Sequence, residues 1–238
     1  MKLFDHTYPT PAENLACEEA LLEAWESATA ADQSDFDPTG LLRFWESPQY
    51  FVVVGYANRI ASEVNEDACR ADGIPIYRRC SGGGTVLQGP GCLNYALVIP
   101  APGATVTETN RFVMDRHRAA LETVLRQPVT VAGVTDLALA GRKFSGNAQR
   151  RKRRYVLFHG TFLLDFDLRR IETYLRTPTR QPAYRQHRPH TEFLCNLGLP
   201  ASQIREALAT AWNAHEPWRG ELVMDSAKYS RAEWNRKF

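Results

Sequence analysis

The stretch Arg78-Arg79-Cys80-Ser81-Gly82-Gly83-Gly84-Thr85-Val86 is the most unusual part of the sequence. It follows an apolar run at residues 74–77, and five of the 15 glycines of the chain lie between residues 82 and 91. Glycines allow a ligand to approach the backbone and leave amides free for oxyanions, and arginine adds charge-assisted hydrogen bonds to phosphate or carboxylate. The segment therefore predicts a binding loop; the alternative is a flexible hairpin turn with surface arginines.

This glycine-rich segment matches neither of the two common nucleotide-binding motifs. A P-loop requires G-x-x-x-x-G-K-[ST], and no Lys-Ser or Lys-Thr follows the glycines. A Rossmann fingerprint requires G-x-G-x-x-G at the start of a helix, whereas Thr85-Val86-Leu87 has the composition of a strand. We therefore reject both motifs.

A second candidate segment is Gly141-Arg142-Lys143-Phe144-Ser145-Gly146-Asn147-Ala148-Gln149, preceded by Val134-Thr135-Asp136-Leu137. A lysine on a strand between small residues can reach into a cavity, where its charge would stabilise a carboxylate that attacks phosphorus. The alternative is a solvated strand lysine.

Together the two segments, with His159-Gly160-Thr161 downstream, resemble the lipoate-protein ligase family over about residues 10–225. The resemblance implies an α+β fold, a single mixed-sheet domain with flanking helices, as in the catalytic domains of biotin and lipoate ligases and octanoyltransferases. It also implies that Lys143 is catalytic and contacts the carboxylate and the phosphate. The implied substrate and ATP contacts are Arg79, Ser81, Gly82, Gly83, Gly84, Thr85, Val86, Leu87, Asp136, Ser145, Ala148 and His159.

Two features depart from the family pattern. Gln88 and Cys92 stand where ligases often have histidine and asparagine. We also expect residues 1–238 to be one catalytic domain without the C-terminal accessory domain of longer ligases. Since some related ligases carry that domain on a separate polypeptide, an accessory subunit is a candidate partner.

Composition and charge define the general class of protein. The chain has 238 residues, 44% of them hydrophobic and 24% charged, and a net charge of +2, typical of one folded domain and too small for a global attraction to nucleic acid. Its longest strongly apolar run, residues 50–55, is far shorter than the roughly 20 residues of a membrane span, and its start lacks a signal-peptide pattern. We expect a cytoplasmic protein with neither nucleic-acid nor membrane partners.

Hydrophobic periodicity predicts a mixed order of helices and strands. Thr10, Pro11 and Glu13 indicate a helix start, and Leu15, Leu22 and Trp25 recur on one face. Helices are expected over residues 11–28, 62–71 and 107–125 and around 204–212. Strands are expected over residues 41–46, 50–55, 74–78, 93–99, 129–131, 136–140, 143–150, 155–166 and 222–224.

The resemblance implies that ATP activates lipoate to enzyme-bound lipoyl-AMP, and that the lipoyl group then passes to a lysine of an acceptor domain. A 2-oxoacid dehydrogenase E2 or a glycine cleavage H-like protein is the expected acceptor. Lys143, Arg79, loop amides and Mg²⁺ would offset the charge that builds at phosphorus. The lipoyl tail needs an apolar slot, for which residues 50–54 or the first helix are candidates. The sequence does not identify the base that deprotonates the acceptor lysine.

The alternative enzyme is an octanoyltransferase, which in this superfamily uses a cysteine nucleophile. One branch places that cysteine just before the glycine-lysine motif, but residues 132–136 contain none. The other places it about twenty residues after the His-Gly pair, whereas Cys195 is 36 residues after His159. A non-enzymatic alternative is a lipoyl-adenylate binding protein, which would not need Lys143.

Other conspicuous residues have simpler interpretations. The basic run Arg150 to Arg154 is either a solvated hairpin tip or a docking surface for an acidic acceptor. His187 and His190 flank Pro189 in a basic loop without a paired carboxylate or cysteine, which argues against a metal site. His117 lies on the apolar face of the long helix and is expected at the edge of the core.

Overall fold

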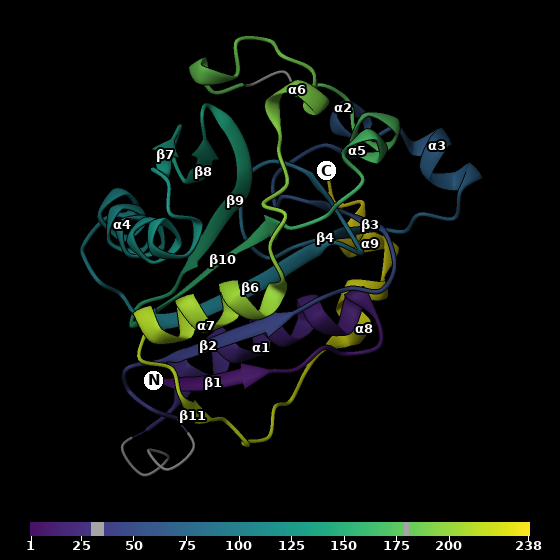
Figure 1. Cartoon of the computed structure of the whole chain (residues 1–238). Coiled ribbons are helices and arrows are strands. Elements are labelled where there is room, and N and C mark those ends of the chain that lie inside the picture. The colour runs from purple at the N-terminus through teal and green to yellow at the C-terminus, as the bar shows by residue number, and fades with distance from the viewer. Residues whose placement is uncertain (30–35, 179–180) are drawn as a thin grey trace.

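The computed structural model of the chain describes residues 1–29, 36–178 and 181–238. Its larger sheet has eight strands in the order β11-β1-β2-β6-β10-β9-β8-β7 (Figure 1). In chain order these are β1 (Lys2–Asp5), β2 (Leu41–Trp45), β6 (Cys92–Pro100), β7 (Thr130–Ala132), β8 (Asp136–Leu139), β9 (Arg142–Arg151), β10 (Tyr155–Leu163) and β11 (Glu216–Pro217). The strands β11, β1 and β2 pair in parallel and the others antiparallel, so the sheet is mixed.

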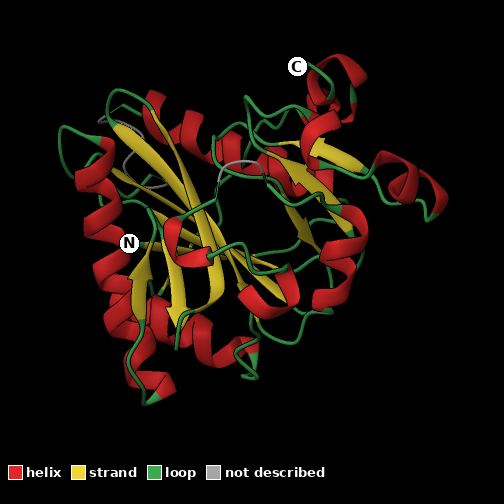
Figure 2. Cartoon of the chain, turned by 90° about the horizontal axis from the view of Figure 1, so that it is seen from above, coloured by secondary structure: helices red, strands yellow, loops and turns green. Residues whose placement is uncertain are grey.

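A second, smaller sheet carries the glycine-rich segment. It consists of β3 (Phe51–Val54), β4 (Ile76–Arg78) and β5 (Val86–Gln88), with β3 in the centre. All four residues of β3 are buried, as their apolar side chains require. Figure 2 shows these short strands set apart from the long strands of the large sheet. The glycines connect β4 to β5, and the start of this connection contacts the large sheet, where Ser81 lies beside His159 of β10.

Three long helices cover the large sheet. Helix α1 (Pro11–Ser27) begins with a capping box in which Thr10 and Glu13 bond each other's backbone N–H. Helices α4 (Val106–Leu125) and α7 (Ala201–Ala211) pack together on one face, over a core that includes Phe44, Phe158 and Trp212 (Figure 1). Helix α1 covers the other face, where Leu21 and Leu22 pack with Leu157. The central strands β2 and β6 are thus buried on both faces.

Short helices complete the fold. They are α2 (Ile60–Glu63), α3 (Glu66–Ala71), α5 (Leu168–Tyr174), the 3₁₀ helix η2 (Ala183–Arg185), α6 (His190–Phe193), α8 (Ser226–Ser230) and α9 (Ala232–Asn235). Within the described ranges, no helix has the length and apolar character needed to cross a bilayer.

The expected α+β fold with a mixed sheet and flanking helices is confirmed, and two local predictions were wrong. The helix expected over residues 62–71 is two helices, because Val64 pairs with Leu175 and Asn65 starts a new helix by accepting from the N–H of Ala68. No strand forms at residues 222–224, where Leu222 and Met224 instead pack toward α1. The neighbour of β1 is β11, formed by residues 216 and 217.

Candidate functional site

A cavity of about 890 Å³ is lined by both sheets and α1, within the size range of small-molecule sites. It brings together segments that are far apart in sequence, because β8, β9 and β10 of the large sheet face β5 of the small one. Of the residues predicted for the site, it is lined by Arg79, Gly83, Gly84, Thr85, Val86, Leu87, Asp136, Lys143, Ser145, Ala148 and His159. Ser81 and Gly82 do not line it, and Ser81 is 1% exposed.

The glycine loop is held by its carbonyl groups. Arg79 donates from Nη2 to the carbonyls of Gly82 (2.6 Å) and Gly84 (2.7 Å), and Asn58 donates from Nδ2 to that of Gly83 (3.0 Å). No acceptor within the described ranges is bonded to the backbone N–H groups of residues 82–85. Consecutive amides without protein partners form an anion-binding concavity when they face a ligand. The loop can therefore bind phosphate or carboxylate oxygens through its backbone.

Arg79 has a mainly structural position beneath this loop. Its Nε also donates to Ser81 Oγ (3.0 Å), and burial lowers the pKa of its guanidinium to about 10, which leaves it charged at neutral pH. Gly83 has a φ of +89°, and a Cβ there would lie 2.8 Å from Arg79 Nη2. Gly84 has open space where a Cβ would project. Of these two glycines, only Gly83 has a backbone conformation that favours glycine. At Gly84 the missing side chain leaves space beside the cavity.

Lys143 is paired rather than free. Its Nζ lies 2.7 Å from Asp136 Oδ1, and the two side chains are 24% and 16% exposed. The hydroxyl of Tyr184 donates to Asp136 Oδ2 (2.7 Å), and burial together with the Asp136 charge raises the pKa of Tyr184. This arrangement fixes the position of the Lys143 ammonium at the cavity wall, where an incoming anion can compete with Asp136 for it.

A buried polar chain from α1 was not predicted from the sequence. Glu18 accepts from Trp45 Nε1 (2.8 Å), and its other oxygen lies 2.5 Å from His159 Nδ1. His159 Nε2 lies 2.5 Å from Ser81 Oγ, so the chain continues through Ser81 to Arg79 and the glycine loop. A signal existed: Glu18 is a carboxylate on the apolar stripe of Leu15 and Leu22.

The electrostatics of Glu18 support a charged carboxylate. Burial alone would raise its pKa, but the charge and hydrogen bond of His159, with help from Arg43 and Trp45, hold the pKa below its ordinary value. The carboxylate can only accept, so His159 donates to Glu18 from Nδ1, and the Ser81 hydroxyl lies at Nε2 on the other side of the ring. The Glu18 end of this chain therefore has a fixed acceptor.

Arg185 is a second residue that the sequence did not single out. It lines the cavity from η2, is 3% exposed and stacks over the ring of Phe193 at 4.9 Å. Its Nη2 has no hydrogen-bond partner in the described part of the chain, and burial lowers its pKa. A buried guanidinium with a spare donor is suited to an anionic ligand. One arginine in a polar loop gave no sequence signal.

A row of side chains leads across the large sheet away from Lys143. Gly146 of β9 pairs with Thr161 of β10, Thr161 with Asn94 of β6, and Asn94 with Trp45 of β2. A Cβ on Gly146 would lie 2.9 Å from Lys143 Nζ, so the row starts at the lysine. Adjacent strands are about 4.8 Å apart, which places Asn94 about 10 Å from Gly146. The far end of the cavity is also lined by Leu15 of α1 and Val53 of β3, the two regions predicted to form an apolar slot.

None of the five cysteines lines this cavity. Burial raises the pKa of Cys17 and Cys69 to about 11 and that of Cys80 and Cys92 to about 12, and it also raises that of Cys195. A nucleophilic cysteine needs a lowered pKa and access to substrate. The structure therefore offers no activated thiol, in agreement with the spacing argument.

The other residues singled out in the sequence, the histidines and the basic run, have no catalytic arrangement in the described part of the chain. No cluster of three or more His, Cys, Asp or Glu residues in the described ranges is arranged to hold a metal ion. His117 is fully buried, and His190 lines the cavity with a pKa lowered to about 4 by burial and nearby Arg185. In the basic run, Arg151 bonds Thr109 and Lys152 pairs with Glu23. Arg150 and Arg154 also donate to backbone carbonyls, and Arg153 has no side-chain partner among the described residues.

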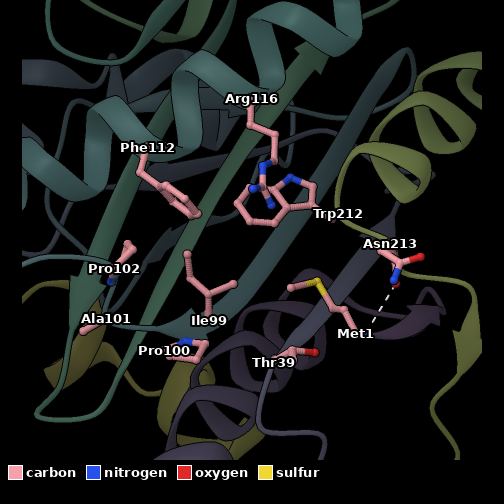
Figure 3. A pocket seen from close by; sticks show the side chains of 10 residues that line it. All are labelled: Met1, Thr39, Ile99, Pro100, Ala101, Pro102, Phe112, Arg116, Trp212 and Asn213. Atoms are coloured by element: carbon pink, nitrogen blue, oxygen red, sulfur yellow. Dashed lines mark hydrogen bonds between the residues drawn. The ribbon is translucent and has the colours of Figure 1, made fainter.

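A smaller pocket of about 480 Å³ contains none of the predicted site residues. It is lined by α4 and by Trp212 and Asn213, which directly follow α7. Arg116 stacks 4.4 Å over the ring of Trp212 and 4.9 Å over that of Phe112 (Figure 3). Ile99 and Met1 supply the opposite, apolar wall. Among the described residues, this pocket is lined by no acidic residue, cysteine, lysine or glycine, whereas Lys143 and the glycine loop line the larger cavity.

Comparison with protein families matches residues 10–211 to the lipoyl protein ligase A/B catalytic domain. An Aeropyrum pernix protein assigned as a lipoate-protein ligase A is 34% identical over 68% of this chain, and the match spans 57% of that relative. The octanoyltransferase LipM of Kyrpidia tusciae is 28% identical over 93% of both chains. LipM of Geobacillus kaustophilus is 28% identical over 99% of this chain and 98% of its own length.

Solved structures show the same fold. A crystal structure of a lipoate-protein ligase A bound with ATP has a TM-score of 0.79 and 22% identity, covering 99% of this chain and 98% of its own. A bi-partite lipoate protein ligase from Thermoplasma acidophilum, studied with its E2 lipoyl domain, has a TM-score of 0.79 and 20% identity, covering 99% and 95%.

Proposed function

Since the chain belongs to the lipoyl protein ligase A/B catalytic-domain family, we propose that it is an ATP-dependent lipoate-protein ligase. It activates lipoate to lipoyl-AMP and transfers the lipoyl group to a lysine of an acceptor domain. A cytoplasmic location belongs to the same proposal and rests on the sequence.

One observation carries this proposal. The large cavity joins Lys143 to the glycine loop, whose amides have no partner among the described residues, and no cysteine lines it. Cationic and amide donors are what an adenylating site needs, because negative charge builds up on the phosphate during attack. A thiol transferase would need an accessible thiolate instead.

In the first step, a carboxylate oxygen of lipoate attacks the α-phosphorus of ATP, and the bond to pyrophosphate breaks. Both reactants are anionic, so Lys143 binds oxygens at the reacting centre while the loop amides donate to phosphate oxygens. Arg185 lines the same cavity, and its Nη2 has no partner among the described residues, which supports a role in binding a further phosphate oxygen. Arg79 acts indirectly, because its donors hold the loop carbonyls.

Mg²⁺ is expected to arrive with the nucleotide. Mg²⁺ commonly uses one or two carboxylates together with substrate phosphates, and Asp136 and Glu63 are the cavity carboxylates near the predicted phosphate contacts. Bound there, the ion would neutralise phosphate charge. The described residues otherwise provide no three-ligand protein site.

In the second step, the acceptor lysine attacks the acyl carbon and AMP leaves. The acceptor is a lipoyl domain of a 2-oxoacid dehydrogenase E2 or of a glycine cleavage H-like protein. The Thermoplasma relative is a bi-partite ligase. For this chain, a separate accessory subunit is therefore part of the proposal, and it would speed adenylation by closing the site.

An octanoyltransferase is the second candidate, because the LipM relatives match this chain over nearly its whole length. Pyrophosphate release and acceptor mass distinguish the two activities. A ligase releases pyrophosphate with lipoate and ATP, and it modifies a lipoyl domain only when ATP is present. Modification from octanoyl carrier protein without ATP, and no pyrophosphate release, would identify the transferase.

A further inference from the structure

The far end of the large cavity contains a short chain of polar side chains that joins the two sheets. Gln88 of β5 donates from Nε2 to Thr161 Oγ1 of β10 (3.0 Å), and Thr161 donates to Asn94 Oδ1 of β6 (2.7 Å). All three line the cavity, and Gln88 and Asn94 are only 8% and 2% exposed. Polar residues so deeply buried are normally fully hydrogen-bonded.

This chain leaves two polar atoms without partners in the described part of the molecule: Gln88 Oε1 and Asn94 Nδ2. The number of unpaired groups is the same whichever way the two side-chain amides are turned. The Thr161 hydroxyl has one hydrogen, so if both amides are flipped, Gln88 Nε2 and Asn94 Oδ1 become the unpaired atoms. One amide donor and one amide acceptor remain free in either case.

These free groups lie where the tail of a bound acid would end. Lys143 marks the carboxylate end of the cavity, and Asn94 lies about 10 Å further along the row of paired residues, beside Trp45. An extended medium-chain acid covers a similar span. The tail would therefore contact Trp45, Leu15 and Val53 along apolar walls and meet Gln88 and Asn94 at its tip.

A hydrocarbon tip would leave both amide groups unpaired and exclude water from them, which disfavours binding. A sulfur atom is polarisable and accepts weak hydrogen bonds, and a thiol also donates one. We propose, on the basis of the proposed function, that Gln88 and Asn94 select acids with sulfur at the distal end over hydrocarbon acids of the same length. The reduced dithiol satisfies both groups, the cyclic disulfide satisfies the donor, and a methyl end satisfies neither.

The test compares dihydrolipoate, lipoate and octanoate on the same protein. Affinity is measured by calorimetry with each free acid, and turnover by acid-dependent ATP–pyrophosphate exchange. We expect the order dihydrolipoate, lipoate, octanoate, with octanoate roughly tenfold or more weaker than lipoate, the effect of leaving buried polar groups unpaired. Lipoate and octanoate within threefold of each other, or the reverse order, would refute the proposal.

Variants assign the effect to the two residues. Gln88→Met keeps the length of the side chain and removes its polar end, so it should bring the lipoate-to-octanoate ratio close to one; Asn94→Leu should act in the same direction. Gln149→Met is the matched control, because Gln149 is also a strand glutamine whose Oε1 has no partner among the described residues, but it lies on β9 outside the cavity. A ratio unchanged in Gln88→Met, in a protein with unchanged thermal stability, would overturn the assignment.

Calorimetry measures binding of the free acids without turnover, so it tests the selectivity separately from the proposed ligase activity. If no acid supports pyrophosphate exchange, the ligase proposal fails, while selective binding of the sulfur acids still supports the role of Gln88 and Asn94. If exchange occurs equally with all three acids, the ligase proposal stands and the selectivity inference fails.

Discussion

Replacing Lys143 tests the proposed adenylation most directly. The Lys143→Met variant keeps most of the side-chain length and removes the charge that lies 2.7 Å from Asp136 and on the cavity wall. A unit charge about 4 Å from a phosphate oxygen contributes ~4 kcal/mol at an effective dielectric constant of about 20. Because Asp136 already neutralises part of the Lys143 charge, we expect a loss of about 3 to 4 kcal/mol, or about 10² to 10³ in rate.

The assay is lipoate-dependent ATP–pyrophosphate exchange, which needs no acceptor. Stability should change less than rate: the Lys143–Asp136 pair is between exposed and buried, so its loss should cost about 1 to 2 kcal/mol of unfolding free energy. Lys152→Met is the matched control, because Lys152 also lies 2.7 Å from a carboxylate, that of Glu23, but outside the cavity. We expect it to exchange pyrophosphate at the wild-type rate.

Two results would refute the role of Lys143. One is a folded Lys143→Met variant that exchanges pyrophosphate within threefold of wild type. The other is an equal loss in Lys152→Met, which would show that the assay responds to general destabilisation. Lys143→Arg keeps the charge, and partial activity there would separate charge from shape.

Four further predictions concern other parts of the molecule. Gly84→Val should abolish tight binding of a lipoyl-adenylate analogue in calorimetry, whereas Gly82→Val should not, since both glycines have open space but only Gly84 lines the cavity. Replacement of all five cysteines by Ala or Ser should preserve ATP-dependent transfer. With pKa values of about 11 to 12, each of the four buried thiols is ionised in fewer than ~1 in 10³ molecules at pH 7.5. An acyl-thioester detected by mass spectrometry would contradict this. Burial and the Arg116 charge lower the pKa of His117 to about 3, so between pH 6.5 and 3 the unfolded chain binds a proton that the folded chain does not. The unfolding free energy should therefore fall as the pH drops through this range. Denaturation curves at several pH values should show a weaker dependence of unfolding free energy on pH in His117→Gln than in wild type. Arg153→Gln should lower the salt dependence of kcat/KM for an acidic acceptor if the basic run is a docking surface, and equal salt dependence would leave it a structural hairpin.

The sequence predicted the fold class and most elements because their signals are local. Thr10, Pro11 and Glu13 start a helix through contacts within one turn, and the long helix ending at Leu125 has a clear apolar stripe. The glycine loop could be selected from its composition alone, whereas Lys143 became the catalytic candidate only through the resemblance to the lipoate-protein ligase family. The strand predicted at residues 222–224 was wrong because apolar residues that pack on a helix have the same composition as a strand.

The roles of the site residues depended on the tertiary structure. Arg79 is a cation next to glycines in the sequence, but only the fold shows that it donates to the loop carbonyls, while the loop amides find no partner in the described part of the chain. Glu18 and His159 are 141 residues apart and meet because α1 packs on the face of the sheet that carries β10. Likewise, the unpaired atoms of Gln88 and Asn94 result from the packing of two sheets. Periodicity identifies the buried face of one element, but the partner of a buried polar group lies on another element, and only the packed chain determines which one it is.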